Sequence, residues 1–466
     1  MKSLRPVLVV LLAFGAMVYR LDGQSFWSDE GASVFMTGRN FGEILQAAAS
    51  DIHPPLYYLL LRYWSVPTGT SEFAVRFLSL AFGLLLVALV YKLGEKLASR
   101  DVGLVAAFLA ATSPFLIYYS QEARMYAQMA ALSTLSVVLA LKIWQRLGGD
   151  EGKRERGEKG KRWDVPFPFS PFTLLPYILA TAACLYTQYY SFTIVLFEDM
   201  VFALVFWRVW RHWRGWLVWI AGQLVVAILY LPWVIRVAGQ LNSWPAISET
   251  FSLQTLAYRV FLVFSFGLSW DMTATAKTQV LFLGLLVVGV LLGGRGKGEK
   301  GEDGACPSSV VPQPSTLNPQ PFALNSQPFT LYPLLFALLY LSVPIFVMYY
   351  LSLSRPMYNP KFLLLATPPF YLLLGMGVIA LRDIVAGTAS RMFPAEASTS
   401  QNRCRANVPV GAVPPCPPPS PPSPPQVPSS SPSPQGPCPL PPSAVPQSAS
   451  SPSPSTFHPS PQGSHR

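Results

Sequence analysis

The chain has 466 residues, of which 51% are hydrophobic and 12% are charged, whereas an average soluble domain carries about 25% charged residues. Its net charge is +11, but the basic residues cluster between apolar runs, which favours the positive-inside rule over a nucleic-acid-binding surface. The five cysteines form no CxxC pair, so neither a metal cluster nor a disulfide framework is indicated. The composition therefore predicts an integral membrane protein.

Long apolar runs recur from the N-terminus to about residue 383, and each can cross a hydrocarbon core of about 30 Å as a helix. The first run is expected to stay as an uncleaved transmembrane helix, because no convincing small-residue cleavage site precedes Arg20. The short apolar stretch 55–66 is predicted to be re-entrant or interfacial. We predict ten spans, at about 6–20, 73–97, 103–120, 126–146, 172–190, 192–208, 215–235, 277–294, 331–351 and 361–381.

Charge in the connecting loops predicts the orientation of these spans. With the N-terminus inside, the most basic segments all fall on the cytoplasmic side, as the positive-inside rule requires: 142–162, 208–214 and 295–300. Both termini are then cytoplasmic. The remaining polar loops are predicted to lie outside, and the first and largest of them is net acidic: 21–72, 121–125, 236–276 and 352–360.

Segments of low complexity separate the apolar runs. Two Gly/Lys/Glu-rich stretches that run into proline and a Pro/Ser-rich tail bury too little apolar surface to offset the entropy of ordering, so they are expected to be disordered. The predicted organisation is an N-terminal membrane module with a catalytic loop at 1–147, a cytoplasmic insert at 148–171, membrane spans at 172–294, a second cytoplasmic insert at 295–330, the last two spans at 331–383 and the tail at 384–466.

Four groups of polar residues fall on the predicted outer face, where ionisable side chains beside a membrane mark candidate sites. Asp29 and Glu30 offer a general base or a metal ligand, or form a solvated acidic loop. Each of the other three groups offers contacts to a hydroxyl or a phosphate, with a plainer alternative. For the second group the alternative is a turn cap, for the third a surface ion pair, and for the fourth a pair of snorkelling anchors. In that order the three groups are His53 and Tyr57, then Gln121, Glu122, Arg124 and Tyr126, and last Arg355 and Lys361.

The four groups together suit a pocket for an anionic lipid head group. Cations would hold the phosphate, a carboxylate would deprotonate an acceptor hydroxyl, and tyrosines would stack on a sugar. The sequence has no Gly-rich phosphate loop or nucleotide fingerprint, and a lipid-linked donor makes a nucleotide-binding domain unnecessary.

These residues lie in a stretch, roughly 20–147, that resembles a known family. The matching segments are Trp27-Ser28-Asp29-Glu30, His53-Pro54-Pro55-Leu56-Tyr57-Tyr58, Glu72-Phe73-Ala74-Val75-Arg76-Phe77-Leu78-Ser79, Ser113-Pro114-Phe115 and Tyr119-Ser120-Gln121-Glu122-Ala123-Arg124-Met125-Tyr126. In order and spacing they resemble the protein O-mannosyltransferases and their bacterial relatives, such as the aminoarabinose–lipid A transferase. The resemblance implies an all-α membrane bundle of the GT-C type, with a large first extracytoplasmic loop.

The resemblance also implies an activity. It is inverting transfer of a monosaccharide from a polyprenyl-phosphate donor to a lipid, glycan or protein acceptor on the non-cytoplasmic face, in cell-envelope glycosylation. Asp29 would act as the base with Glu30 in support, while His53 and Glu122 would line the pocket and Arg124 would lie near the donor phosphate. The other substrate-binding candidates of the site are Tyr57, Gln121 and Tyr126.

The sequence departs from the family in two places. Lys361 stands where relatives often have a phosphate-binding arginine, so the bidentate fork is lost, and Arg355 is the candidate to substitute. A Pro/Ser tail stands where many relatives have an extracytoplasmic domain. A divalent metal is left open, because some members of the wider class use one and others do not.

The main rival interpretation is a polytopic transporter or lipid flippase, favoured by Glu198 and Asp199 inside a predicted span. Against it, the other spans lack charges near their centres and no matching halves are evident. A membrane scaffold that recruits partners through the proline tail is the second rival.

Overall fold

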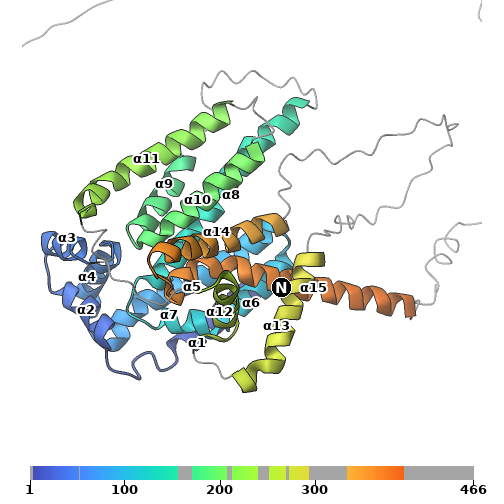
Figure 1. Ribbon diagram of the computed structural model, residues 1–466, viewed down its shortest axis with the longest axis horizontal. Coiled ribbons are helices and arrows are strands. Elements are labelled where there is room, and N and C mark those ends of the chain that lie inside the picture. Colours follow the sequence, from blue (N-terminus) through green and yellow to red (C-terminus); the bar gives the residue numbers. More distant parts are fainter. Residues whose placement is uncertain are drawn as a thin grey trace, which may run out of the picture. The chain divides into compact units, whose positions relative to one another are not determined.

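The computed structural model describes residues 4–51, 53–155, 171–206, 213–239, 251–268, 272–292 and 333–392. These residues belong to one compact unit, Met1–Ala395. Most of the first predicted insert, all of the second and nearly all of the predicted tail lie outside the described residues. Within those ranges the regular structure is helical and no strand is present (Figure 1), so the predicted all-α class is confirmed.

The N-terminal half contains the helices that carry most of the candidate residues. They are α1 (Leu4–Val18), α2 (Ser28–Thr37), α3 (Phe41–Ala49), α4 (Leu56–Thr68), α5 (Glu72–Leu97), α6 (Arg100–Ala111), α7 (Pro114–Ser120) and α8 (Tyr126–Glu155). The C-terminal half adds α9 (Pro171–Leu185), η1 (Tyr189–Ser191), α10 (Phe192–Phe206), α11 (Trp213–Val237), α12 (Leu253–Phe266), α13 (Met272–Leu292), α14 (Pro333–Ser354), η4 (Pro360–Ala366) and α15 (Thr367–Met392).

Six of these helical segments are long and apolar enough to cross a bilayer, and the bent pair α6 and α7 makes up to seven. They are Glu72–Leu97, Tyr126–Leu147, Gly215–Val237, Thr275–Leu292, Pro333–Ser354 and Pro360–Ala386. Several apolar side chains on them face outward in the bundle, such as Val280 at 72% exposed and Ile235 at 67%, as expected for surfaces in contact with lipid. The chain is therefore a multi-pass membrane protein.

Each of the ten predicted spans coincides with a helix or with the bent pair, but the predicted number of ten is not confirmed. The helices at the first and fifth predicted spans are shorter than a full span, and α10 has 15 described residues. The sequence did not predict α12, whose apolar residues are interrupted by Gln254, Thr255 and Arg259. Two helices also continue past their predicted ends, α8 to Glu155 and α15 to Met392.

A bend of 62° separates α6 from α7, where a continuous span was predicted at 103–120. The Ser113 side chain accepts a hydrogen bond from the Leu116 N–H, and Pro114 occupies the first turn of α7. A proline there lacks only an N–H that the first turn leaves unpaired, while its ring disfavours continuing the preceding helix. Tyr371 of α15 donates to Ser113 Oγ over 2.6 Å, which holds the bend against the bundle.

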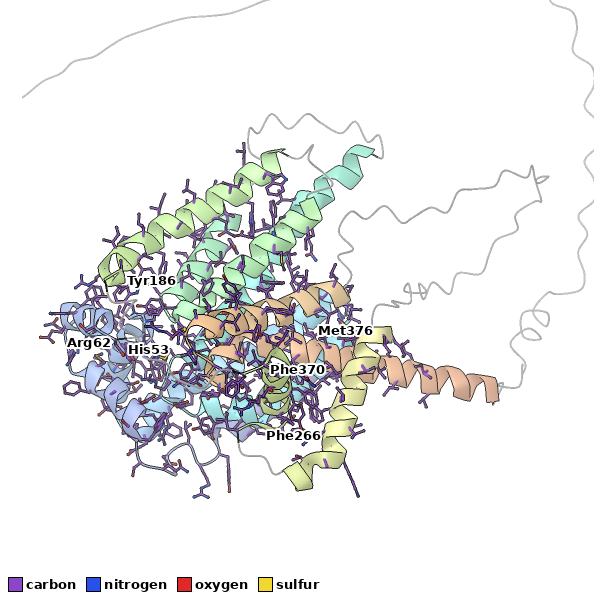
Figure 2. The ribbon with its side chains drawn as sticks, in the orientation of Figure 1. His53, Arg62, Tyr186, Phe266, Phe370 and Met376 are labelled. Carbon is purple, nitrogen blue, oxygen red and sulfur yellow. The ribbon has the colours of Figure 1, made fainter. Side chains whose placement is uncertain are left out.

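The large first loop, residues 21–72, folds into three short helices. Asn40 and Glu43 form a capping box at the start of α3. Arg62 of α4 donates to the Thr37 carbonyl at the end of α2 over 2.6 Å, and Figure 2 shows Arg62 and His53 in this same part of the chain. The Leu56 N–H also donates to the carbonyl of Tyr186, the residue after α9, over 3.0 Å. Helix α4 therefore holds α2 and joins the loop to the bundle.

Helices α13 and α15 cross closely at two glycines. A Cβ added at Gly377 of α15 would collide with the Leu285 carbonyl oxygen of α13, and one at Gly289 would collide with the Leu373 carbonyl oxygen. Without side chains at these two positions the backbones of α13 and α15 can touch, which is how membrane helices commonly associate. The two helices are in contact, and their ribbons cross in Figure 1.

We expect Gly377→Ala to lower the free energy of unfolding by about 1–3 kcal/mol, because the added methyl overfills a backbone contact. Thermal unfolding in detergent micelles measures the effect. The matched control is Gly284→Ala on α13, where no atom lies within 4 Å of the added Cβ. The control should be neutral or slightly stabilising, since alanine is the better helix former. Equal melting temperatures for the two variants would contradict the proposed packing.

Candidate active site

The buried carboxylate of Glu30 joins three distant parts of the chain. Arg76 of α5 donates to it twice, from Nε to Oε1 over 2.8 Å and from Nη2 to Oε2 over 2.7 Å. The Ala123 backbone N–H donates to the same Oε1 over 2.9 Å. The side chains of Arg76 and Glu30 are only 7% and 2% exposed, so this is a desolvated, bidentate pair. It fixes the start of α2 against α5 and against the loop between α7 and α8.

Arg76 also organises the segment that leads into α2. Its Nη1 donates to the carbonyls of Leu21 and Gln24 over 2.9 and 2.8 Å, and its Nη2 to the carbonyl of Ser25 over 3.4 Å. One guanidinium therefore sets the path of the chain just before Asp29.

Asp29 lies in the first turn of α2, where the helix dipole favours an acidic side chain. Adjacent helical residues diverge by about 100°, so the buried position of Glu30 leaves the Asp29 carboxylate pointing elsewhere. Its side chain is 37% exposed. Arg124 Nη2 lies 3.7 Å from Asp29 Oδ2, and Lys361 Nζ lies 3.9 Å from the same oxygen. Asp29 is thus an accessible carboxylate beside two cations from distant parts of the chain.

Arg124 is held by its neighbours on the inner side of the site. Its Nη1 donates to the Asp29 carbonyl over 3.1 Å, and its Nη2 lies 3.4 Å from His53 Nε2. Its Nε is buried and has no hydrogen-bond partner among the described residues. A buried donor without a partner is costly, and a bound anion is one group that would satisfy it.

His53 lies between Asp51 and Arg124, and its predicted contact with substrate stays a prediction. Burial lowers the pKa of His53, with the nearby Arg124 contributing, although the hydrogen bond to Asp51 acts in the opposite direction. The ring is therefore neutral at pH 7. Its Nδ1 lies 3.1 Å from Asp51 Oδ2 and donates to that carboxylate, which leaves Nε2 as an acceptor for Arg124.

Glu122 is a buried carboxyl close to the two cations. Burial raises its pKa to about 7, and the charges of Arg124 and Lys361 reduce the size of that rise. Its Oε2 is buried and, within the part of the chain that the structure describes, has no hydrogen-bond partner. Its proton is therefore held to a higher pH than that of an exposed glutamate.

The aromatic wall of the site is Tyr126, at the start of α8. The Lys361 ammonium lies 5.2 Å from the centre of its ring, and Phe362 packs beside it with ring centres 6.3 Å apart. The lysine predicted to replace the arginine of relatives therefore reaches the same group of side chains as Asp29.

Three predicted site residues make other contacts. Both Glu30 oxygens are engaged as described above. The Tyr57 hydroxyl is buried against Ser79 Oγ at 2.9 Å, and Ser79 in turn donates to the Arg124 carbonyl. The Gln121 amide donates to the carbonyls of Met17 and Tyr19 at the end of α1. These contacts engage the polar groups of all three side chains. The supporting catalytic role of Glu30 and the substrate contacts of Tyr57 and Gln121 stay predictions.

Arg355 follows α14, where its backbone N–H donates to the Leu351 carbonyl, and its predicted phosphate contact stays a prediction. The sequence did not predict Arg76 as a site residue, although it lies in one of the segments that resemble the family. Its charge inside the predicted apolar span 73–97 was the signal that could have identified it. Among the described residues no group of three or more His, Cys, Asp or Glu side chains could hold a metal ion.

Comparison with solved structures identifies the class of fold. The chain matches the apo crystal structure of ArnT from Cupriavidus metallidurans with a TM-score of 0.50 and 14% identity, over 82% of this chain and 61% of that one. ArnT bound to undecaprenyl phosphate matches with 0.49, and the Archaeoglobus fulgidus oligosaccharyltransferase with 0.46 over 87% of this chain and 54% of that one, both at 14% identity. The fold is the GT-C fold of membrane glycosyltransferases. The chain spans about three fifths of the length of the ArnT chain.

A comparison with protein-family models matches part of the N-terminal half of the chain. Residues 52–149 match the family model described as dolichyl-phosphate-mannose-protein mannosyltransferase. The resemblance to the protein O-mannosyltransferase and ArnT type is thereby confirmed. No curated protein matches the chain.

We expect Arg76→Gln to lower the free energy of unfolding by about 3 kcal/mol, because it leaves the buried Glu30 carboxylate without its cation. Unfolding in detergent measures this loss. The control is Arg382→Gln, which breaks the exposed pair with Asp101 at 2.6 Å and should cost less than about 1 kcal/mol. Equal losses in the two variants would show that the Glu30 pair is not buried in the native protein.

A second expectation concerns pH. Because the pKa of Glu122 is raised from 4.5 to about 7, the folded state binds its proton more tightly than the unfolded state does. Its contribution to stability is therefore present at low pH and is lost as pH rises from about 4.5 to 7. In Glu122→Gln that part of the decline in melting temperature should disappear. The exposed carboxylate variant Glu43→Gln should keep it, and an unchanged profile in Glu122→Gln would contradict the assignment.

Proposed function

We propose that this protein is an inverting glycosyltransferase that moves a monosaccharide from a polyprenyl-phosphate donor to a hydroxyl group of a lipid, glycan or protein acceptor. The observation that carries the proposal is the Asp29 carboxylate with the cations of Arg124 and Lys361 within 4 Å. The match of residues 52–149 to a family described as using dolichyl-phosphate mannose supports the lipid-linked donor.

In the proposed reaction Asp29 accepts the proton of the acceptor hydroxyl as the acceptor oxygen attacks the anomeric carbon of the donor. The bond between that carbon and the phosphate oxygen breaks, and its electron pair leaves with the polyprenyl phosphate. A single displacement from the opposite side inverts the configuration at the anomeric carbon. The charge that develops on the leaving phosphate lies beside Arg124 and Lys361, which stabilise it.

Donor binding would also prepare the base. The Asp29 carboxylate lies beside both cations. A donor phosphate would bring a second anion to Arg124 and Lys361 and compete for them, leaving the Asp29 carboxylate to the acceptor proton. The buried Nε of Arg124 would gain an acceptor in the same step. Lysine and arginine differ here, because only Arg124 can form a planar bidentate contact with a phosphate.

The proposed site lies on the non-cytoplasmic face, with both chain termini in the cytoplasm. This orientation follows from the charges of the loops: the basic segments lie between spans, and the loop that forms α2, α3 and α4 is net acidic.

The experiment is sugar transfer by the purified protein from a panel of polyprenyl-phosphate sugars, with wild type beside Asp29→Asn. Loss of a general base should lower the transfer rate by about 10²–10⁴-fold. Asp29 is 37% exposed and its contacts with Arg124 and Lys361 are long, at 3.7 and 3.9 Å, so the variant should melt close to the wild-type temperature.

The matched control is Glu43→Gln, which changes an exposed carboxylate of the same loop and should keep full activity. A wild-type protein that neither transfers nor hydrolyses any donor, and binds none of them, would refute the proposed function. Equal rates in wild type and Asp29→Asn would leave the transferase but refute the role of Asp29.

A further inference from the structure

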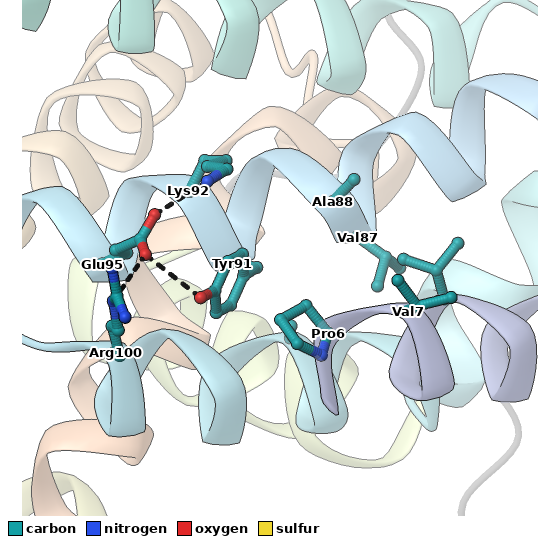
Figure 3. Close-up of a pocket in the computed structure, with 10 residues that line it drawn as sticks. Pro6, Val7, Val87, Ala88, Tyr91, Lys92, Glu95 and Arg100 are labelled. Carbon is teal, nitrogen blue, oxygen red and sulfur yellow. Dashed lines mark hydrogen bonds and ion pairs between the residues drawn. The ribbon is translucent and has the colours of Figure 1, made fainter. Parts of the chain in front are cut away.

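A groove of about 500 Å³ lies between α1, α5 and α6 (Figure 3). Its volume falls within the range of small-molecule sites, roughly 300–1,000 Å³. The residues that line it are Pro6, Val7, Val10, Val87, Ala88, Tyr91, Lys92, Glu95, Arg100 and Ala107. We call it the α1–α5–α6 groove.

Polar and apolar groups are segregated along this groove, as Figure 3 shows. One end is formed by apolar side chains of the three helices, and the other end by Lys92, Glu95 and Arg100. Glu95 accepts from Lys92 Nζ over 2.8 Å and pairs with Arg100 Nε at 3.1 Å, while the Tyr91 hydroxyl donates to it over 3.2 Å. An apolar trough with one charged end matches a molecule with an apolar chain and a polar head.

The charged end favours an anion. Lys92 and Arg100 outweigh Glu95 by one positive charge, and their side chains are 57% and 76% exposed, so both can reach a ligand. The pair with Glu95 uses Nε of Arg100 and leaves the two terminal nitrogens of its guanidinium for a phosphate. The start of α6, where Ser99 accepts from the Val102 N–H, adds the positive end of a helix dipole.

The position of the groove separates it from the proposed donor site. Lys92 follows Arg76 by 16 residues on α5, which corresponds to about 24 Å along a helix. That distance approaches the thickness of a hydrocarbon core, roughly 30 Å. A head group at Lys92 therefore belongs to the opposite leaflet from a phosphate at Arg124.

We propose that the α1–α5–α6 groove binds an anionic phospholipid of the leaflet opposite the candidate active site. An acyl chain lies along Val10, Val87 and Ala88, and the phosphate lies against Lys92 and Arg100. The lipid fills the gap between α1 and α5 and stabilises the packing of the first helix. This binding is independent of the proposed transferase activity.

The test uses the full chain, purified in detergent and stripped of lipid, with native mass spectrometry to measure the affinity of added phosphatidylglycerol and phosphatidylcholine. Wild type should bind phosphatidylglycerol more tightly. The double variant Lys92→Gln with Arg100→Gln should weaken phosphatidylglycerol binding by about 30-fold, because the loss of each cation weakens it by about fivefold. Glu95→Gln should act in the opposite sense and tighten binding, because it makes the charged end more positive.

Two further variants control for shape and general charge. Ala88→Trp fills the apolar end and should weaken binding of both lipids. Arg382→Gln removes a cation that pairs with Asp101 beside the start of α6 but does not line the groove, so it should leave both affinities unchanged. Equal affinity of wild type for the two lipids, or an unchanged affinity for phosphatidylglycerol in the double variant, would overturn the proposal.

Discussion

The candidate site depends on one buried ion pair, between Glu30 of α2 and Arg76 of α5. Its geometry is bidentate, and the third hydrogen bond to Glu30 comes from the Ala123 N–H of the loop that carries Arg124. Three segments far apart in the sequence are thereby fixed at one point. Because an isolated charge is costly to bury, neither partner can be removed without exposing the other to an apolar interior.

The site built on this pair has a different electrostatic character. Arg124 and Lys361 each place a nitrogen within 4 Å of the Asp29 carboxylate, at 3.7 and 3.9 Å, and neither contact is a short ion pair. The Glu30 pair is closed, whereas the Asp29 cluster has buried polar atoms without partners in the described residues, at Arg124 Nε and Glu122 Oε2. Glu30 therefore stabilises the fold, whereas the adjacent Asp29 is the carboxylate with a proposed chemical role.

Hydropathy predicted the helices of the bundle well, because each apolar run can satisfy its backbone only as a helix in lipid. It could not predict where α6 ends and α7 begins, since that bend depends on the Ser113 cap and on Tyr371 from the far end of the chain. In the site, the sequence pattern chose Asp29, Arg124 and Lys361, which the fold brings together. It could not distinguish Gln121 and Tyr57, whose polar groups bond to α1 and to Ser79, because the partner of a side chain is set by tertiary packing.

The two carboxylates of α2 are neighbours in sequence and face different partners. The rotation of α2 about its own axis therefore decides which carboxylate faces which partner. Shortening or lengthening the segment before Ser28 by one residue would rotate the helix by about 100° for a given depth of insertion. A different side chain would then face Arg76, and a different one would face the accessible part of the site. The Arg76 guanidinium binds the carbonyls of Leu21, Gln24 and Ser25. These contacts fix the path of the chain before α2 and therefore the rotation of the helix. Residues 21–27, which carry no proposed chemistry, should therefore tolerate substitution better than a change of length.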